Sequence, residues 1–376
     1  MNNLKTFNSP SARLLDVVRG VAALLVVLGH SRDISARVSG LNHTGDSFFE
    51  MVLLVPSSFA VEAVAVFFVL SGYLVGGQVI RQNREGRFRW GEFLIKRLSR
   101  LWAVLIPGLF ITYISWLAMT HLSPQSYTLA ENSTLPSALC NVLFLQESWC
   151  DSYLINSSLW SLSYEFWFYI IFTSLITALY ALFSQSWTSV ILNTLVVFLS
   201  IAIFGTQVLL LIPAWLLGVG ISLVAEKPNM IRDNIRSKAY TWLMSSLVLL
   251  MFSFFLSNHL HLDRTMLTLT VSIPSALVIL SITQIEHEIP LLRRPIDIGA
   301  NLGKWSFSIY VFHLPIVKVL LTLAHKQELI NLFGLPIMTY SIVLVTLPLT
   351  WLMWWLTERH TNQLRDTMFT IYNTKK

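Results

Sequence analysis

Long runs of apolar residues alternate with short polar stretches along almost the whole chain. A helix needs about 20 predominantly apolar residues to cross a bilayer, and most of these runs approach that length. Backbone amides surrounded by lipid must find their partners within the protein, so a spanning segment is a helix or a strand of a closed barrel. Barrel strands alternate apolar and polar positions, whereas these runs are apolar at consecutive positions.

The pattern therefore predicts an all-α integral membrane protein, a polytopic bundle of about ten transmembrane helices. We see no internal repeat, low-complexity tract or linker rich in Pro and Gly, so residues 1–376 are expected to form a single transmembrane domain. The expected helices span residues 14–31, 58–80, 101–120, 159–183, 188–204, 206–225, 239–257, 266–285, 305–325 and 336–357.

The composition supports this prediction. Of the 376 residues, 54% are hydrophobic and only 12% are charged, about half the charged share of a soluble domain. The formal net charge of +6 does not indicate a nucleic-acid partner, because Lys and Arg lie in short loops without interleaved aromatic residues. The loops carry 20 Lys and Arg on the side of the N-terminus and 4 on the opposite side. The positive-inside rule then predicts that both termini are cytoplasmic.

The first expected helix carries two ionisable residues, Arg19 and His30. Eleven residues advance a helix by about 1100°, which leaves the two side chains about 20° apart in azimuth and roughly 16 Å apart along the axis. A histidine near the outer end of a span can act as a general base near neutral pH, and an arginine at half depth suits an anionic or carbonyl oxygen. The alternative is a snorkelling arginine and an interfacial histidine without function.

The most basic loop ends in Lys96-Arg97-Leu98-Ser99-Arg100, where the third helix is expected to begin. Arg97 and Arg100 are three residues apart and share one helical face. Two guanidinium groups on one face suit phosphate groups. Plain topology signalling explains the same residues, and both interpretations stay open at this point.

Two further spans carry polar residues. The fourth opens with Trp160-Ser161-Leu162-Ser163-Tyr164-Glu165, which places Glu165 about two turns below the outer surface. A carboxylate at that depth must be protonated or paired, and Arg19 and His30 are the expected partners, although a purely structural pair remains an alternative. The ninth carries Ser306, Ser308, Tyr310, His313 and Pro315, with Lys318 further along the same wall. Helical spacing brings Ser306, Tyr310 and His313 near one face, which is expected to line a polar cavity.

Cys140 and Cys150 both fall in the expected loop 121–158 on the outer side. An oxidising compartment would favour a disulfide between them, and two free thiols are the alternative. This loop is the longest between the expected helices, so it is the best candidate for a small ordered cap.

Taken together, these segments resemble the acyltransferase-3 family of bacterial membrane acyltransferases. The resemblance rests on Arg19-x10-His30, the run Phe67–Leu74, Arg97-x2-Arg100, Trp160-Ser161-Leu162 with Glu165, and Ser308-x-Tyr310-x2-His313, which appear in the family's order over residues 14–315. One departure is Ala65, which stands where many relatives carry an acidic residue; Glu62, about one turn earlier, is a candidate replacement.

The resemblance implies a multi-pass protein of the bacterial inner membrane that moves an acyl group, usually acetyl, from cytoplasmic acyl-CoA to a sugar hydroxyl. The acceptor is expected to be an envelope or exported glycan, or a lipid-linked saccharide, such as lipopolysaccharide O-antigen, capsule or exopolysaccharide. No metal and no permanently bound cofactor are implied. Besides these two substrates, membrane lipid is the expected partner.

The same resemblance implies roles for individual residues. His30 is the expected general base, Arg19 holds or polarises the donor, and Glu165 orients or balances the pair. Arg97 and Arg100 are expected to contact the phosphates of coenzyme A. The expected substrate-binding residues are Ser308, Tyr310, His313 and Trp160.

Two other classes of protein remain as hypotheses. A secondary transporter or flippase can use intramembrane charges as a relay, but it would favour inverted repeats or paired broken helices, and the sequence shows neither clearly. A sensor or scaffold with this fold would not need Arg19, His30 and Glu165 together.

Overall fold

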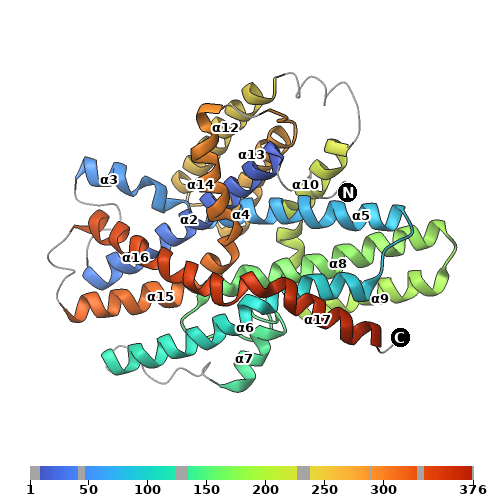
Figure 1. The fold of residues 1–376 in the computed structure, drawn as a ribbon, viewed down its shortest axis with the longest axis horizontal. Coiled ribbons are helices and arrows are strands. Elements are labelled where there is room, and N and C mark those ends of the chain that lie inside the picture. The colour runs from blue at the N-terminus through green and yellow to red at the C-terminus, as the bar shows by residue number, and fades with distance from the viewer. Residues whose placement is uncertain are drawn as a thin grey trace. The chain divides into compact units, whose positions relative to one another are not determined.

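The computed structural model describes residues 9–40, 47–123, 134–226, 238–287, 290–327 and 334–374, and within these ranges the chain is almost entirely helical without a β-strand (Figure 1). Nine segments of this described part are long and apolar enough to cross a membrane. The prediction of a polytopic all-α membrane protein is therefore confirmed. The side of the membrane on which the termini lie stays a prediction.

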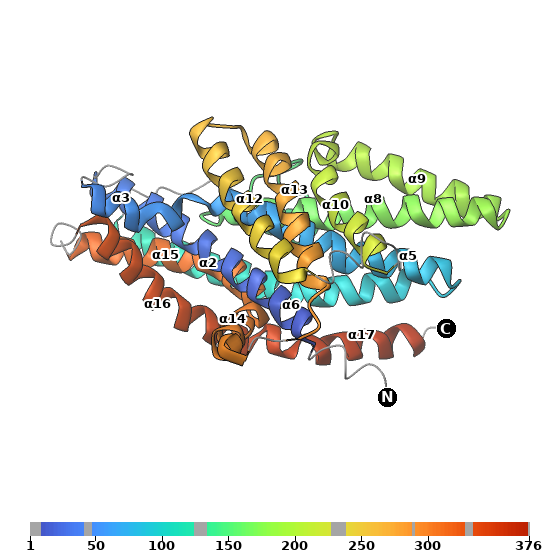
Figure 2. The same cartoon turned by 90° about the horizontal axis from the view of Figure 1, so that it is seen from above.

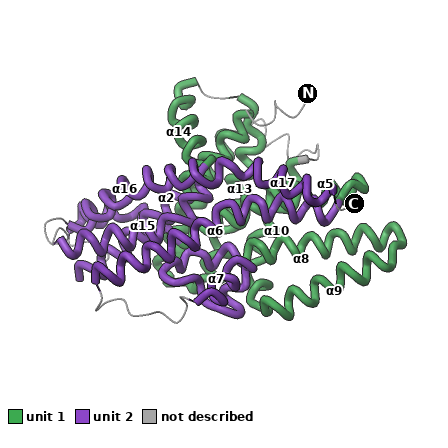
Figure 3. The backbone as a smooth tube through the Cα atoms, turned by 60° about the horizontal axis from the view of Figure 1, so that its bottom comes forward, with its two compact units in different colours: residues 1–22, 61–88, 164–304 green, residues 23–60, 89–163, 305–376 purple. Residues whose placement is uncertain are grey.

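The helices group into two compact units that interleave along the sequence (Figure 3). Unit 1 comprises residues 1–22, 61–88 and 164–304, and unit 2 comprises residues 23–60, 89–163 and 305–376. Helix α2 (Pro10–Ser39) contributes its first part to unit 1 and the remainder to unit 2. Helix α8 (Trp160–Phe183) is shared in the same way.

Unit 1 is built around a close helix crossing. The end of α4 runs into a π-helical turn that packs on α10, and α10 and α12 both pack on α13, as Figure 2 shows for the last pair. A Cβ at Gly72 would lie 1.9 Å from the backbone oxygen of Trp215, so glycine is required there. The elements of this unit besides the shared helices are α4 (Ala60–Ser71), η2 (Gly72–Gly76), α5 (Gly77–Arg84), α9 (Trp187–Phe204), α10 (Gln207–Glu226), α12 (Ala239–His259), α13 (Arg264–Thr283), η5 (Pro290–Leu292) and α14 (Arg293–Lys304).

Unit 2 has α15 at its centre, packed against both α6 and α16, while the last helix, α17, packs along the beginning of α6. A Cβ at Gly108 would lie 2.4 Å from the side chain of Val311, so glycine allows the close approach of α6 and α15. The elements of this unit are α3 (Phe48–Leu54), η1 (Val55–Ser58), α6 (Trp90–Leu122), α7 (Leu135–Val142), η4 (Ser157–Leu159), α15 (Ser306–Lys326), α16 (Leu335–Leu356), η7 (Glu358–His360) and α17 (Thr361–Thr374).

Every helix expected from the sequence overlaps a helix of the structure, but two differences matter for the site. Helix α2, which corresponds to the expected span 14–31, carries six Asp and Arg residues and is not among the nine apolar segments. Helix α6 begins at Trp90, so the basic stretch around Arg97 is helical and not part of a loop. The predicted single domain is neither confirmed nor contradicted by the two units, and it stays a prediction.

Several ordered elements were not expected, among them α14, α17 and the turn η2. Helices α14 and α17 lie in stretches that the sequence pattern assigned to loops, because both are amphipathic and a search for uniformly apolar runs passes over them. The π-helical turn η2 interrupts the second span between Gly72 and Gly76. Such turns are rare and occur often at functional sites.

Candidate active site

Two histidines meet in unit 2. His30 of α2 is partly buried, His313 of α15 is fully buried, and His30 Nδ1 lies 3.0 Å from His313 Nε2. Their ring centroids are 5.0 Å apart with the planes tilted by 39°. Sequence analysis predicted His30 as a base and His313 as a substrate contact, but it did not pair them.

The hydrogen bonds around the two rings fix where the protons lie. His313 Nδ1 is 3.0 Å from the carbonyl oxygen of Ile309 and 2.8 Å from that of Tyr310. Carbonyl oxygens only accept, so His313 Nδ1 carries a proton. Since a buried imidazole is costly to charge without an anionic partner, His313 is neutral and its Nε2 is an acceptor. His30 Nδ1 then donates to His313 Nε2.

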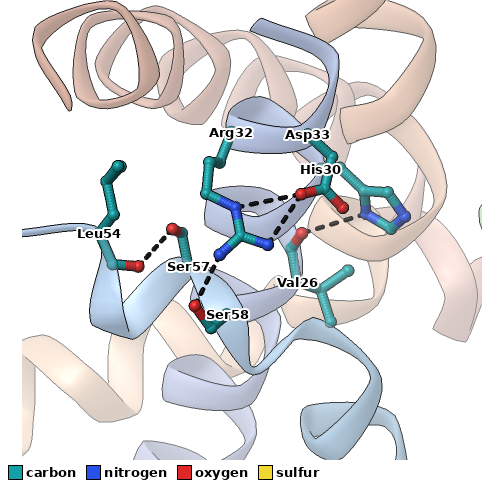
Figure 4. A network of polar contacts seen from close by, with 7 residues as sticks. All are labelled: Val26, His30, Arg32, Asp33, Leu54, Ser57 and Ser58. Carbon is teal, nitrogen blue, oxygen red and sulfur yellow. Dashed lines mark hydrogen bonds and ion pairs between the residues drawn. The ribbon is translucent and has the colours of Figure 1, made fainter. Parts of the chain in front are cut away.

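A second acceptor holds the same proton on His30. The carbonyl oxygen of Val26 lies 3.1 Å from His30 Nδ1, and a dashed line marks this contact in Figure 4. Both contacts require a proton on Nδ1, so Nε2 of neutral His30 bears the lone pair. Within the described residues no group is hydrogen-bonded to that Nε2. The arrangement presents a basic nitrogen, and it can stabilise the imidazolium that forms when the nitrogen takes a proton.

Next to His30, the C-terminal part of α2 carries a polar cluster. Arg32 donates to Asp33 Oδ1 from Nε at 3.1 Å and from Nη2 at 2.8 Å, and its Nη1 donates to Ser58 Oγ at 2.6 Å (Figure 4). A Cβ at Gly29 would lie 2.5 Å from the Cβ of Ala60, so the chain around Ser57 and Ser58 packs directly on α2. The cluster fixes the helix beside the histidine.

Other predicted substrate contacts are engaged inside the fold. Tyr310 donates its hydroxyl proton to the carbonyl oxygen of Ser158 at 2.7 Å, so Ser161 Oγ, 2.6 Å away, is the donor to the Tyr310 oxygen. Ser308 donates from both its backbone N–H and its Oγ to Glu358 Oε2, at 3.0 Å and 2.6 Å. Trp160 is partly buried at the beginning of α8. Whether Ser308, Tyr310 and Trp160 also bind substrate stays a prediction.

The segment 134–158 packs along α6. Trp102 Nε1 donates to the carbonyl oxygen of Val142 at 3.0 Å, and Asn156 Nδ2 donates to Thr112 Oγ1 at 3.2 Å and to the carbonyl oxygen of Val311 at 2.9 Å. These contacts place the segment alongside the apolar part of α6. Whether this segment also forms the expected small ordered cap stays a prediction.

Cys140 and Cys150 form a disulfide within this segment. Of the two alternatives that the sequence left open, a disulfide and two free thiols, the structure has the disulfide. The side chain of Asn141, beside the first cysteine, donates to the carbonyl oxygen of Asp151 at 3.1 Å and accepts from the backbone N–H of Tyr153 at 3.1 Å. The covalent link and these bonds hold the segment in one conformation.

The predicted phosphate-binding pair lies on the first turns of α6. Arg97 stacks over the ring of Phe93, with 5.8 Å from its guanidinium carbon to the ring centroid. Arg100 is exposed and makes no ion pair with any described residue. Helix α17 covers the neighbouring face, where a Cβ at Gly91 would lie 2.5 Å from the ring of Tyr372. Because Arg100 itself is exposed and makes no ion pair with any described residue, its guanidinium group is available to bind an anion.

Unit 1 holds the other two predicted catalytic residues. Arg19 forms an ion pair with Asp16 one turn earlier on α2, at 2.9 Å. Glu165 on α8 accepts hydrogen bonds from the hydroxyl groups of Ser71, at 2.6 Å, and of Tyr169. The structure thus gives Arg19 a carboxylate and Glu165 two hydroxyl donors, and the roles predicted for both residues stay predictions.

The bonds to Glu165 extend across the π-helical turn of unit 1. Trp215 Nε1 on α10 donates to Ser71 Oγ at 3.3 Å, and Ser71 precedes the turn.

Glu62, the candidate replacement for the acidic residue missing at Ala65, is only 2% exposed and accepts from Ser257 Oγ at 3.1 Å. Glu62 therefore faces protein and not water.

Comparison with known proteins identifies the family of the chain. The model of the acyltransferase domain family matches residues 13–355, so the chain belongs to the acyltransferase-3 family. Among curated relatives, an O-acetyl transferase of Shigella phage Sf6 is 28% identical over 214 residues. The match covers 54% of this chain and 56% of the relative, so it spans about half the length of each. No solved structure matches the chain.

Proposed function

We propose that the protein is a membrane O-acyltransferase in which His30 is the general base. The observation that carries the proposal is the proton arrangement of the histidine pair, which leaves a lone pair on His30 Nε2. Membership of the acyltransferase-3 family supports it. So does the similarity to a protein named O-acetyl transferase.

In the proposed reaction, His30 Nε2 removes the proton from an acceptor hydroxyl as its oxygen attacks the thioester carbonyl of acyl-CoA. A carbon–oxygen bond forms, the carbon–sulfur bond breaks, and the proton leaves with the thiol of coenzyme A. During the transfer His30 is an imidazolium, and its Nδ1 proton stays bonded to His313 Nε2 and to the Val26 carbonyl. General-base catalysis of this kind contributes typically 10²–10⁴-fold to a rate.

The donor is proposed to be acetyl-CoA that enters from the cytoplasm, with Arg100 and Arg97 on its phosphates. Arg19, on the same helix as His30, is proposed to hold or polarise the donor. The acceptor is proposed to be a hydroxyl of an envelope or exported glycan at the inner membrane.

The test uses purified protein in detergent, radiolabelled acetyl-CoA, and glycan extracted from cells that lack the gene. We expect alkali-labile label to appear in the glycan with the wild type and with His325→Ala, a variant of an exposed histidine in the last turn of α15. His30→Ala should reduce the transfer by at least 100-fold while the amount of protein in the membrane stays the same. Undiminished transfer by His30→Ala would remove His30 from catalysis.

The same experiment addresses the transporter hypothesis. Detergent solution has no second compartment, so a protein that only moves a substrate across the membrane cannot leave label on the glycan. Absence of label with wild-type protein would favour transport.

A further inference from the structure

Two cations near His30 have no anionic partner among the described residues of unit 2. Lys318 is partly buried on α15, and its ammonium donates to the carbonyl oxygen of Ile155 at 2.7 Å. An ammonium group has three donors, and within the described residues no carboxylate pairs with this one. A charge removed from water without a counter-ion is costly in free energy. An anionic ligand beside Lys318 would offset this cost.

The second cation is Arg37, in the last turn of α2. Seven residues advance a helix by about 700°, which places Arg37 within about 20° of the azimuth of His30 and roughly 10 Å further along the axis. Its side chain is exposed, and it makes no ion pair within the described chain. Its charge acts on both His30 and Lys318, so the three groups belong to one electrostatic neighbourhood.

The nearby carboxylate does not balance these charges, because it already has a cation. Asp33 acts electrostatically on His30, but two nitrogens of Arg32 hold its Oδ1 (Figure 4). Arg32 and Asp33 therefore balance each other, and Lys318 and Arg37 remain as an excess of positive charge beside His30.

Neither the positive-inside rule nor snorkelling explains the positions of Arg37 and Lys318. The predicted topology leaves four Lys and Arg in the outer loops, and Arg32 and Arg37 are two of them. Topology signalling places cations on the cytoplasmic side, so it does not explain Arg37. Snorkelling directs a lysine ammonium toward water, whereas the ammonium of Lys318 is directed to a backbone carbonyl of the segment 134–158.

We propose that Lys318 and Arg37 bind an anionic group, a carboxylate or a phosphate, on the acceptor, and so bring a neighbouring hydroxyl to His30 Nε2. The inference rests on the proposed function and adds to it the class of acceptor: an acidic or phosphate-bearing glycan. Arginine suits both groups because its planar fork can make two parallel hydrogen bonds to them. Lys318 contributes a point charge with two further donors.

The test uses the native acceptor, so its identity need not be known beforehand. Glycan from cells that lack the gene is divided into three samples: untreated, carboxyl-reduced with carbodiimide and borohydride, and dephosphorylated with hydrogen fluoride. Each sample is acetylated with purified wild-type protein and radiolabelled acetyl-CoA. We expect transfer to fall at least tenfold after one treatment; the effective treatment identifies a carboxylate or a phosphate. Equal transfer to all three samples would overturn the inference and leave the acyltransferase intact.

Variants test the two residues directly. With untreated glycan, Lys318→Gln and Arg37→Gln should each raise KM for the acceptor about tenfold and leave KM for acetyl-CoA unchanged. Lys326→Gln, at the exposed end of α15, is the matched control and should behave as wild type. With the sensitive group removed from the acceptor, wild type and both variants should be equally slow.

Two results would contradict this assignment. Unchanged acceptor KM in both variants would mean that neither residue meets the acceptor. No transfer by wild-type protein to any sample would overturn the proposed function together with the inference. Equal transfer to all three samples would overturn the inference alone, so the two outcomes can be distinguished.

Discussion

Replacing His313 with leucine tests the arrangement on which the proposed chemistry depends. The change removes the acceptor Nε2 that lies 3.0 Å from His30 Nδ1 and keeps a side chain of similar size in a fully buried site. The carbonyl groups of Ile309 and Tyr310 lose a contact to the ring, but they remain bonded within the helix through the i→i+4 ladder. The protein should therefore still fold.

The expected loss follows from one hydrogen bond to a charge that develops during the reaction. Such a bond is worth about 1.5–3 kcal/mol, and each 1.36 kcal/mol of barrier is a factor of ten. The leucine variant should therefore have kcat lower by roughly 10- to 150-fold. The loss should be smaller than that of His30→Ala, because Val26 still accepts from Nδ1.

The assay measures kcat and KM for both substrates in wild type, His313→Leu and His313→Gln. Glutamine carries an amide oxygen that can accept from His30 Nδ1, so this variant should fall between the other two. Since the bond strengthens as charge develops, kcat should change and both KM values should stay near wild type. A leucine variant with wild-type kcat would refute the pairing. A raised acceptor KM with unchanged kcat would instead make His313 a substrate contact.

Three further predictions concern other parts of the chain. Gly72→Ala should lower the melting temperature in detergent by several degrees, because its Cβ would lie 1.9 Å from a backbone oxygen of α10, whereas Gly220→Ala meets no atom within 4 Å and should not. Glu165→Gln keeps an acceptor for its hydroxyl partners, so the melting temperature should stay the same. A loss of kcat of at least tenfold would show that catalysis needs the negative charge of Glu165. An unchanged kcat would mean that the residue has a structural role. Arg100→Gln should raise KM for acetyl-CoA about tenfold. Arg89→Gln is the control and should leave this KM unchanged, because the wild-type Arg89 side chain lies 3.8 Å from Glu92. Equal effects of the two substitutions would point to folding.

The spans were predictable because lipid imposes a rule that acts on each segment alone. A run of consecutive apolar residues must be helical whatever its neighbours are, so every expected helix overlaps a helix of the structure. Helices α14 and α17 are amphipathic and need a surface to lie on, and the sequence does not state which surface. The π-helical turn η2 depends on α10, which packs against Gly72 from 143 positions later in the chain, at Trp215.

The candidate site was predictable residue by residue but not pair by pair. Helical periodicity places His30 on one face of α2, yet it cannot tell which helix meets that face. The expected partners were Arg19 and Glu165; the structure pairs His30 with His313 and gives Arg19 and Glu165 other partners. Glu358, which holds Ser308, lies beyond the last expected span, so no signal within the ninth span could have found it.

A comparison of the polar side chains of unit 2 separates packing from chemistry. Tyr310, Ser308 and Asn156 direct their hydrogen-bonding groups to other parts of the fold. His30 keeps a lone pair on Nε2 and Lys318 keeps two donors that no described residue engages. An unsatisfied hydrogen-bonding group in an apolar bundle costs free energy, and a ligand bound to His30 Nε2 and to the Lys318 ammonium would recover it. On this argument the chemistry of unit 2 lies in the C-terminal half of α2, where a base and an excess of positive charge occur together.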